Sequence, residues 1–282
     1  IRDRFQAPHH AHSLSPALPR ERPDDIAEWS GYHEGRLPFE RFRKVTGITG
    51  IDLVEQAFHT GGPTLSPPFD FGMGKPLVLR GREVLLGELE FALLCRLELL
   101  PALKSTLTRR GTLLLFEDVE ARMRGRLVSL SGRQRPEEGP VSTSSAGITP
   151  HDKLLNALDT GLDEGWIGVI PRPTVPFLPF DDHDGTAALR ERCLEVLAWH
   201  EALVDKPRRF LLTADYVVGA DAMGYVSDEA WDPRHLEALE KRYDAVESQL
   251  VFFPRLVARV GPFIRGRIPD KRRSSDKATG PE

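Results

Sequence analysis

The most apolar stretch of the chain limits what this sequence can fold into. It reads VLLGELEFALLCRLELLPAL at residues 84–103, and charged side chains interrupt it at Glu88, Glu90, Arg96 and Glu98. A membrane-spanning helix needs about 20 consecutive, predominantly apolar residues. We therefore expect no membrane span, and we expect this stretch to lie in the core of a soluble protein.

The leucines of this stretch predict a buried helix at 83–100. The stripe consists of Leu85, Leu89, Leu93, Leu97 and Leu100. Residues spaced by three or four positions fall on one face of a helix, and Pro101 is expected to end it. A short strand is expected just before this helix, at 76–80.

Residues 112–130 fit either a strand or a helix. Polar and apolar side chains alternate around Val119, which is typical of a strand, yet the apolar residues also fit a helical stripe. Acidic residues come early in the segment and arginines come late, an order that complements the helix dipole. A helix is therefore favoured.

Further along the chain the local signals are clearer. Thr149, Pro150 and the nearby Asp152 predict the start of a helix, as cap, first residue and first-turn acid. The expected strands are GWIGVI at 165–170 and RRFLLTADYVVGA at 208–220, with a helix at 185–204 between them.

These elements indicate a helix-rich α+β fold with a small sheet, although the order of the strands stays open. The 282 residues divide into five segments. They are an irregular N-terminal arm (1–37), the first half of the core (38–130), a linker or long surface loop (131–149), the second half of the core (150–264) and a basic tail (265–282).

The densest group of candidate metal ligands lies at 181–184, where the sequence is DDHD. In an extended backbone Asp181 and His183 point the same way, so the pair could supply two ligands to a metal ion. His151 and Asp152 are the other close His–Asp pair, and only the fold could bring them to the first. The competing interpretation is an acidic cap on the helix that follows, and we favour it because it needs no distant partner.

Two further acids, Asp215 and Asp221, flank the strongest predicted strand and its following turn. The carboxyl ends of strands are where α/β proteins place their ligand sites. Aspartate is also an ordinary turn residue, and that simpler interpretation is favoured.

Two features suggest contacts with other molecules. The first is the basic C-terminal stretch 255–277, with eight basic and two acidic residues in a chain of net charge −4. Its candidate contact residues are Arg265, Arg267, Lys271, Arg272 and Arg273, which could touch nucleic acid or an acidic protein surface. The second is an apolar seam of Leu236, Leu239, Tyr243, Val246 and Leu250, which could pack on a helix of the same core or of another subunit.

Nothing in the sequence matches a nucleophile elbow, a phosphate-binding loop or a dinucleotide fingerprint. The favoured function is therefore a non-catalytic structural or interaction protein, one subunit of a larger assembly such as a virus particle, a ribosome-associated complex or a secretion machine. The alternative is a metal-dependent hydrolase that uses Asp181 and His183.

The expected partners follow from the favoured function. They are other protein subunits or further copies of this chain, with nucleic acid as a candidate ligand of the tail; no membrane and no cofactor is expected. The chain has two cysteines, Cys95 and Cys193, with no C-x-x-C pair. Two buried free thiols favour a reducing intracellular compartment or a particle surface.

Overall fold

The fold is built on a five-stranded parallel sheet with the strand order β3-β2-β1-β4-β5. A computed structural model describes residues 38–60, 77–107, 110–131, 149–175, 187–219, 233–253 and 255–257. The strands are β1 (Glu83–Leu86), β2 (Thr112–Phe116), β3 (Ile167–Ile170), β4 (Arg209–Thr213) and β5 (Leu250–Phe252). The sheet joins both predicted halves of the core, since β1 pairs with β2 on one side and with β4 on the other.

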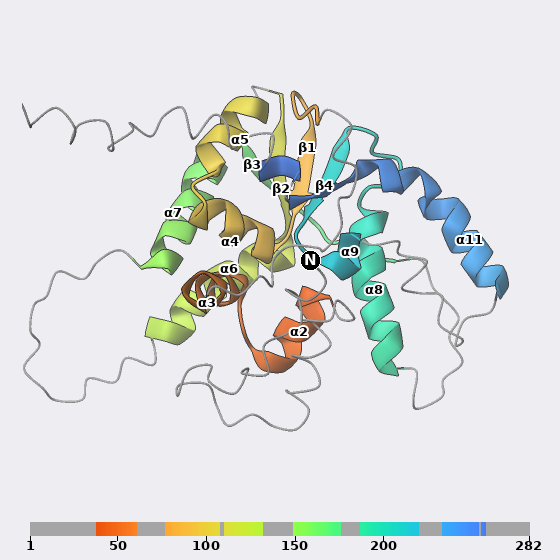
Figure 1. Ribbon diagram of the computed structural model, residues 1–282, viewed down its shortest axis with the longest axis horizontal. Coiled ribbons are helices and arrows are strands. Elements are labelled where there is room, and N and C mark those ends of the chain that lie inside the picture. Colours follow the sequence, from red (N-terminus) through yellow and green to blue (C-terminus); the bar gives the residue numbers. More distant parts are fainter. Residues whose placement is uncertain are drawn as a thin grey trace, which may run out of the picture.

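Helices cover both sides of this sheet (Figure 1). One side of the sheet is covered by the helices that the chain forms between β1 and β3. They are α4 (Glu88–Arg96), α5 (Leu100–Leu107), α6 (Glu117–Ser131) and α7 (Pro150–Asp163). The other side carries α8 (Ala187–Glu201), α9 (Tyr216–Gly219), α11 (Pro233–Tyr243) and the 3₁₀ helix η3 (Asp244–Gln249). Two N-terminal helices, α2 (Phe39–Thr46) and α3 (Gly50–Thr60), pack below the carboxyl ends of the strands in this view. The expected helix-rich fold with a small sheet is confirmed.

The two central strands β1 and β2 are apolar after their first residues, Glu83 and Thr112. Val84–Leu86 of β1 and Leu113–Phe116 of β2 are buried without alternation. Continuous apolar runs of this kind are typical of parallel strands that are covered on both faces. The sheet is therefore the centre of the hydrophobic core, and only its ends are open to polar chemistry.

The single helix predicted at 83–100 is wrong. The stretch contains β1, then Gly87, then α4, and Pro101 lies at the start of α5 instead of ending a helix. The strand expected at 76–80 is also absent, because the described residues there form irregular backbone and a turn. Leucine spacing could not separate these alternatives, since Leu85 and Leu89 are buried whether the chain is a strand, a helix or one followed by the other.

The helix favoured for 112–130 is half correct. Residues 112–116 are β2, and the helix α6 begins at Glu117. Likewise, the strand expected at 208–220 ends at Thr213, and its last residues form the short helix α9. In both places an acidic residue marks the change from strand to helix.

Where local capping signals were strong, the predictions are confirmed. Thr149 caps α7 by accepting the backbone N–H of Asp152, with Pro150 as the first helical residue. The strand predicted at 165–170 is β3, and the helix predicted at 185–204 is α8. The linker at 131–149 lies outside the described residues except at its two ends.

Gly50 lets the backbone of α3 lie directly against that of α4, and a substitution at this position tests the packing. A Cβ atom at this position would lie 2.9 Å from the backbone carbon of Glu88 and 3.0 Å from Cα of Leu89. Backbone atoms cannot rotate away, so we expect Gly50→Ala to lower the free energy of unfolding by about 1–3 kcal/mol. Chemical denaturation would measure this. Gly125→Ala is the control, because a Cβ there meets nothing within 4 Å; equal stabilities of the two variants would contradict the packing.

Two further expectations concern membranes and thiols. Within the described part of the chain, no helix is long and apolar enough to cross a bilayer. Cys95 is a free thiol that is partly buried against the core, and burial raises its pKa to about 12. The side chain of Cys193 lies outside what the structure describes.

Candidate functional site

The strand order changes direction between β1 and β4. From β1 the chain continues to β2 on one side, whereas β4 leads to β5 on the other side. The connections therefore diverge and leave a crevice at the carboxyl ends of these two strands, next to Gly87 and Ala214. In open parallel sheets this switch point is the usual place for a ligand.

Glu90 bridges the ends of the two strands. One carboxylate oxygen, Oε2, accepts the backbone N–H of Gly87 at 3.1 Å, and Oε1 accepts the N–H of Ala214 at 2.7 Å. The hydroxyl of Thr213 also donates to Oε1 at 3.3 Å. Burial raises the pKa of Glu90, although these hydrogen bonds act in the opposite direction.

Gly87 permits this close approach. A Cβ atom at position 87 would lie 2.8 Å from Oε2 of Glu90 and 3.5 Å from the ring of Trp199. Any side chain there would push the Glu90 carboxylate away from the strand ends. In the sequence LGELE at 86–90, the leucine therefore ends β1, the glycine leaves room beside the strand end, and the carboxylate of Glu90 occupies that room.

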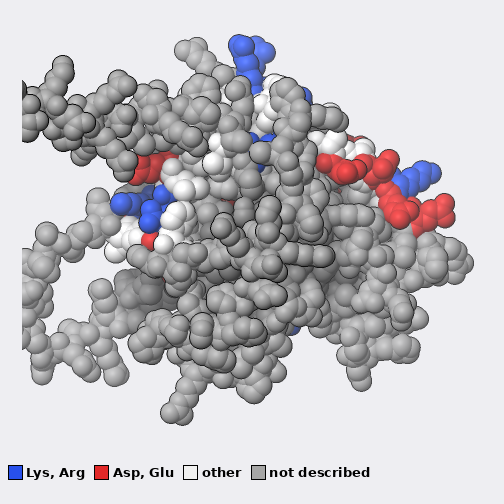
Figure 2. Space-filling model, viewed as in Figure 1, with Lys and Arg blue, Asp and Glu red and all other residues white. Residues whose placement is uncertain are grey.

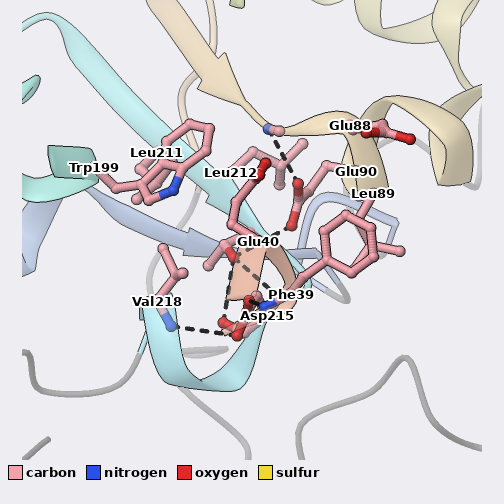
Figure 3. A pocket seen from close by; sticks show the side chains of 12 residues that line it. Phe39, Glu40, Glu88, Leu89, Glu90, Trp199, Leu211, Leu212, Asp215 and Val218 are labelled. Carbon is pink, nitrogen blue, oxygen red and sulfur yellow. Dashed lines mark hydrogen bonds between the residues drawn. The ribbon is translucent and has the colours of Figure 1, made fainter. Parts of the chain in front are cut away.

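Asp215 follows β4 and uses its two oxygens differently. Oδ1 accepts the backbone N–H groups of Val217 at 2.9 Å and Val218 at 3.4 Å, and so caps α9. Oδ2 accepts the N–H of Phe39, the first residue of α2 (Figure 3). Burial raises the pKa of Asp215 to about 7, the bond from Phe39 lowers it, and the nearby charge of Glu90 raises it.

Two more acids complete the crevice. Glu88 accepts the N–H of Gly50 at 2.7 Å, and burial raises its pKa. Glu40 of α2 is 4% exposed and pairs with Arg122 of α6 at 2.8 Å. Because these carboxylates come from α2, α4 and the end of β4, only the folded chain brings them together.

The cavity that these residues surround is small. Its volume is about 20 Å³, room for roughly one water molecule. Trp199 and Val218 border one side and Glu88 and Leu89 the other (Figure 3). The full lining is Phe39, Glu40, Gly87, Glu88, Leu89, Glu90, Trp199, Leu211, Leu212, Thr213, Asp215 and Val218. Among these described residues there are four acids and no lysine or arginine.

An ion-pair network lies beside the cavity at the same edge of the sheet. Arg172, just after β3, binds Asp118 with two hydrogen bonds of 3.1 and 2.9 Å. Its guanidinium also lies over the rings of Phe116 and Trp199, at 4.7 and 5.4 Å. Burial alone would raise the pKa of Asp118, but Arg172 and Arg122 outweigh it and lower that pKa.

The structure describes two of the four predicted metal ligands, so their meeting stays a prediction. Asp181 and His183 lie outside the described residues. His151 and Asp152 lie in the first turn of α7, where the carboxylate of Asp152 accepts hydrogen bonds from Thr149. No group of three or more His, Cys, Asp or Glu side chains in the described part of the chain could hold a metal ion.

The predicted apolar seam packs within this chain. Leu239, Tyr243 and Val246 are buried in its own core, and Leu250 begins β5. The outward side of α11 carries acidic and basic side chains next to one another (Figure 2). The side chain of Leu236 and the tail residues Arg265, Arg267, Lys271, Arg272 and Arg273 lie outside what the structure describes.

Sequence reasoning identified one member of the crevice and missed the others. Asp215 was a candidate because it follows a strong strand. Glu88 and Glu90 were interpreted only as interruptions of an apolar stretch. The feature that could have revealed them is a pair of acids directly after a buried strand and a glycine. No feature of the sequence around Glu40 indicated that this residue belongs to the site.

Comparison of the chain with family models, with curated proteins and with solved structures found no match.

Proposed function

We propose that this chain is a ligand-binding α/β protein that takes a small, positively charged molecule without phosphate groups into the crevice between β1 and β4, and exchanges a proton with it through Asp215. One observation carries the proposal: four acidic side chains, and no basic one, line the cavity at the switch point of the sheet.

The acidic side chains of this lining favour a cation over an anion. Oδ1 of Asp215 is committed to capping α9, but Oδ2 binds only the amide of Phe39 on α2 among the contacts described. That oxygen becomes free for a ligand when Phe39 moves. Trp199 lies on the same cavity, and an indole ring attracts cations to its face, as it already does with Arg172.

Phosphate does not fit this crevice. In dinucleotide-binding proteins the N–H groups at the start of the helix after the first strand bind the pyrophosphate. Here the first turn of α4 contains Glu88 and Glu90, and the N–H of Gly87 is already bonded to Glu90. A phosphate group would meet these carboxylates at close range.

The proton-transfer part of the proposal is supported by Asp215. A pKa of about 7 lets a carboxyl group both accept and release a proton at neutral pH. Its position at the carboxyl end of a central strand is also where α/β proteins place reacting groups.

The two functions expected from the sequence stay predictions. The metal-dependent hydrolase depends on Asp181 and His183, and the assembly subunit depends on the terminal arm and the basic tail. These segments lie outside the described residues. A third support for the assembly role was the apolar seam at 236–250, and the seam residues whose side chains the structure describes pack against the chain's own core.

Titration calorimetry with a matched pair of nucleosides tests the ligand class. S-adenosylmethionine and S-adenosylhomocysteine differ by one methyl group and the sulfonium charge. We expect the sulfonium compound to bind about tenfold tighter, equivalent to about 1.4 kcal/mol. We expect ATP to bind more weakly than either.

The variant Asp215→Asn should remove most of this preference, because asparagine keeps the cap of α9 but not the charge. Glu237→Gln, on the exposed side of α11, is the matched control and should leave both affinities unchanged. Preferential binding of ATP, or a charge preference that survives Asp215→Asn, would contradict the proposal.

A further inference from the structure

The first turn of α2 fills the crevice. Phe39 and Glu40 both line the cavity, and both are only 4% exposed. The amide of Phe39 also takes the one oxygen of Asp215 that is not needed to cap α9 (Figure 3). With α2 in this position a cavity of about 20 Å³ is too small for an organic ligand.

Polar contacts fasten α2 to three separate parts of the chain. Phe39 bonds to Asp215 after β4, Glu40 pairs with Arg122 on α6, and Lys44 pairs with Glu195 on α8. On the apolar side, Phe39 and Phe42 are buried. Each polar contact joins α2 to a neighbour across the crevice edge, so each would break if α2 moved away.

A hinge separates α2 from α3. Gly47 ends α2 with a φ of 73°, in the left-handed region that glycine adopts without strain, and a Cβ there would meet nothing within 4 Å. The chain is fixed again directly after Gly47, because Ile48 is buried in the core, Thr49 is hydrogen bonded to Asp52 of α3, and the N–H of Gly50 donates to Glu88 at 2.7 Å. Motion about Gly47 would therefore leave α3 in place.

We propose that α2 is a gate: it turns about Gly47, releases Oδ2 of Asp215 and opens the crevice, while the sheet and α3 stay folded. The identity of what enters rests on the proposed function, but the opening itself does not. In the closed state Phe39 and Glu40 occupy the place of the ligand, so the chain inhibits its own site.

Hydrogen exchange measured on the full chain tests the gate. The variant Glu40→Gln removes the charge that pairs with Arg122 and, within α2, with Arg43, and Lys44→Met removes the pair with Glu195 from the more exposed side of α2. We expect the amides of residues 42–46 to exchange at least about tenfold faster in Glu40→Gln and about two- to fivefold faster in Lys44→Met, whose ion pair is more exposed. The amides of β1 and β4 should keep their rates.

Glu55→Gln is the matched control, because it removes a similar ion pair with Arg96 that joins α3 to α4 away from the crevice. It should leave the exchange of α2 unchanged. If α2 and the strands accelerate together in both Glu40→Gln and Lys44→Met, α2 opens only when the whole chain unfolds, and the gate is overturned. These experiments contain no ligand, so failure of S-adenosylmethionine to bind would count against the ligand class alone.

Discussion

Replacing Glu90 by alanine is expected to lower the free energy of unfolding by on the order of 4 kcal/mol, because the change leaves buried donors at the ends of two central strands without partners. The N–H groups of Gly87 and Ala214 both depend on this carboxylate. An unpaired buried donor costs about 1–3 kcal/mol, and the space left by the side chain adds to the loss. Urea denaturation would measure the difference.

Two other variants separate the role of Glu90 from the general effect of losing a glutamate. Glu90→Gln keeps the volume and one acceptor oxygen, so its loss should be smaller than that of Glu90→Ala. Glu237→Ala makes the same chemical change on the exposed side of α11 and should stay within about 0.5 kcal/mol of the parent. Equal stabilities of Glu90→Ala and Glu237→Ala would show that the strand ends do not depend on this carboxylate.

Much of the helical part of the fold could be predicted because its signals are local. At the start of α7, threonine, proline and aspartate each satisfy a requirement of the first helical turn within four residues. No partner from elsewhere in the chain is needed for that inference. The same holds for β3, which is short, apolar and bounded by glycine and proline.

The central strands could not be predicted with the same certainty. Leu85 would be buried in a helix as it is in β1, and Leu115 would be buried in a helix as it is in β2. What makes these residues strands is pairing with partners far along the chain, such as Leu85 with Leu211. Tertiary pairing therefore overrides a local pattern that fits both structures.

The candidate site was hidden for a related reason. A carboxylate directly after a strand becomes a site residue only if that strand is central, and the position of β1 was not known. Phe39 and Asp215 are hydrogen bonded although they are 176 residues apart. No spacing rule within one segment could place α2 over the end of β4.

The contribution of Asp215 to the stability of the protein should fall by on the order of 4 kcal/mol as the pH rises from about 4 to about 7. The pKa of this carboxyl is about 7 in the folded chain, against 3.8 for an ordinary aspartate. The folded state therefore holds the proton more tightly than the unfolded state. Protonation below pH 7 stabilises the fold, and the stabilisation is lost as the pH rises through that range.

Neighbouring carboxylates and neighbouring amides act on the pKa of Asp215 in opposite directions. The charge of Glu90 raises the pKa of Asp215, and burial raises the pKa values of Glu90 and Glu88 themselves. Glu40 lines the same cavity. The amides of Phe39, Val217 and Val218 favour the ionised form and limit the shift. Asp118 works oppositely: its lowered pKa gives stability that is lost only below about pH 4, outside this window.

Denaturation at several pH values, with the parent chain and Asp215→Asn, would measure this dependence. The variant still accepts the N–H groups of α9 but has no proton to lose at this position, so its stability should fall less steeply between pH 4 and 7, with Glu90 and Glu88 supplying the slope that remains. Glu237→Gln should follow the parent. If Asp215→Asn keeps the full slope, the neutral-pH titration belongs to another group. If it flattens the slope, the crevice contains a carboxyl that changes charge at neutral pH, which is the property that proton exchange with a bound cation requires.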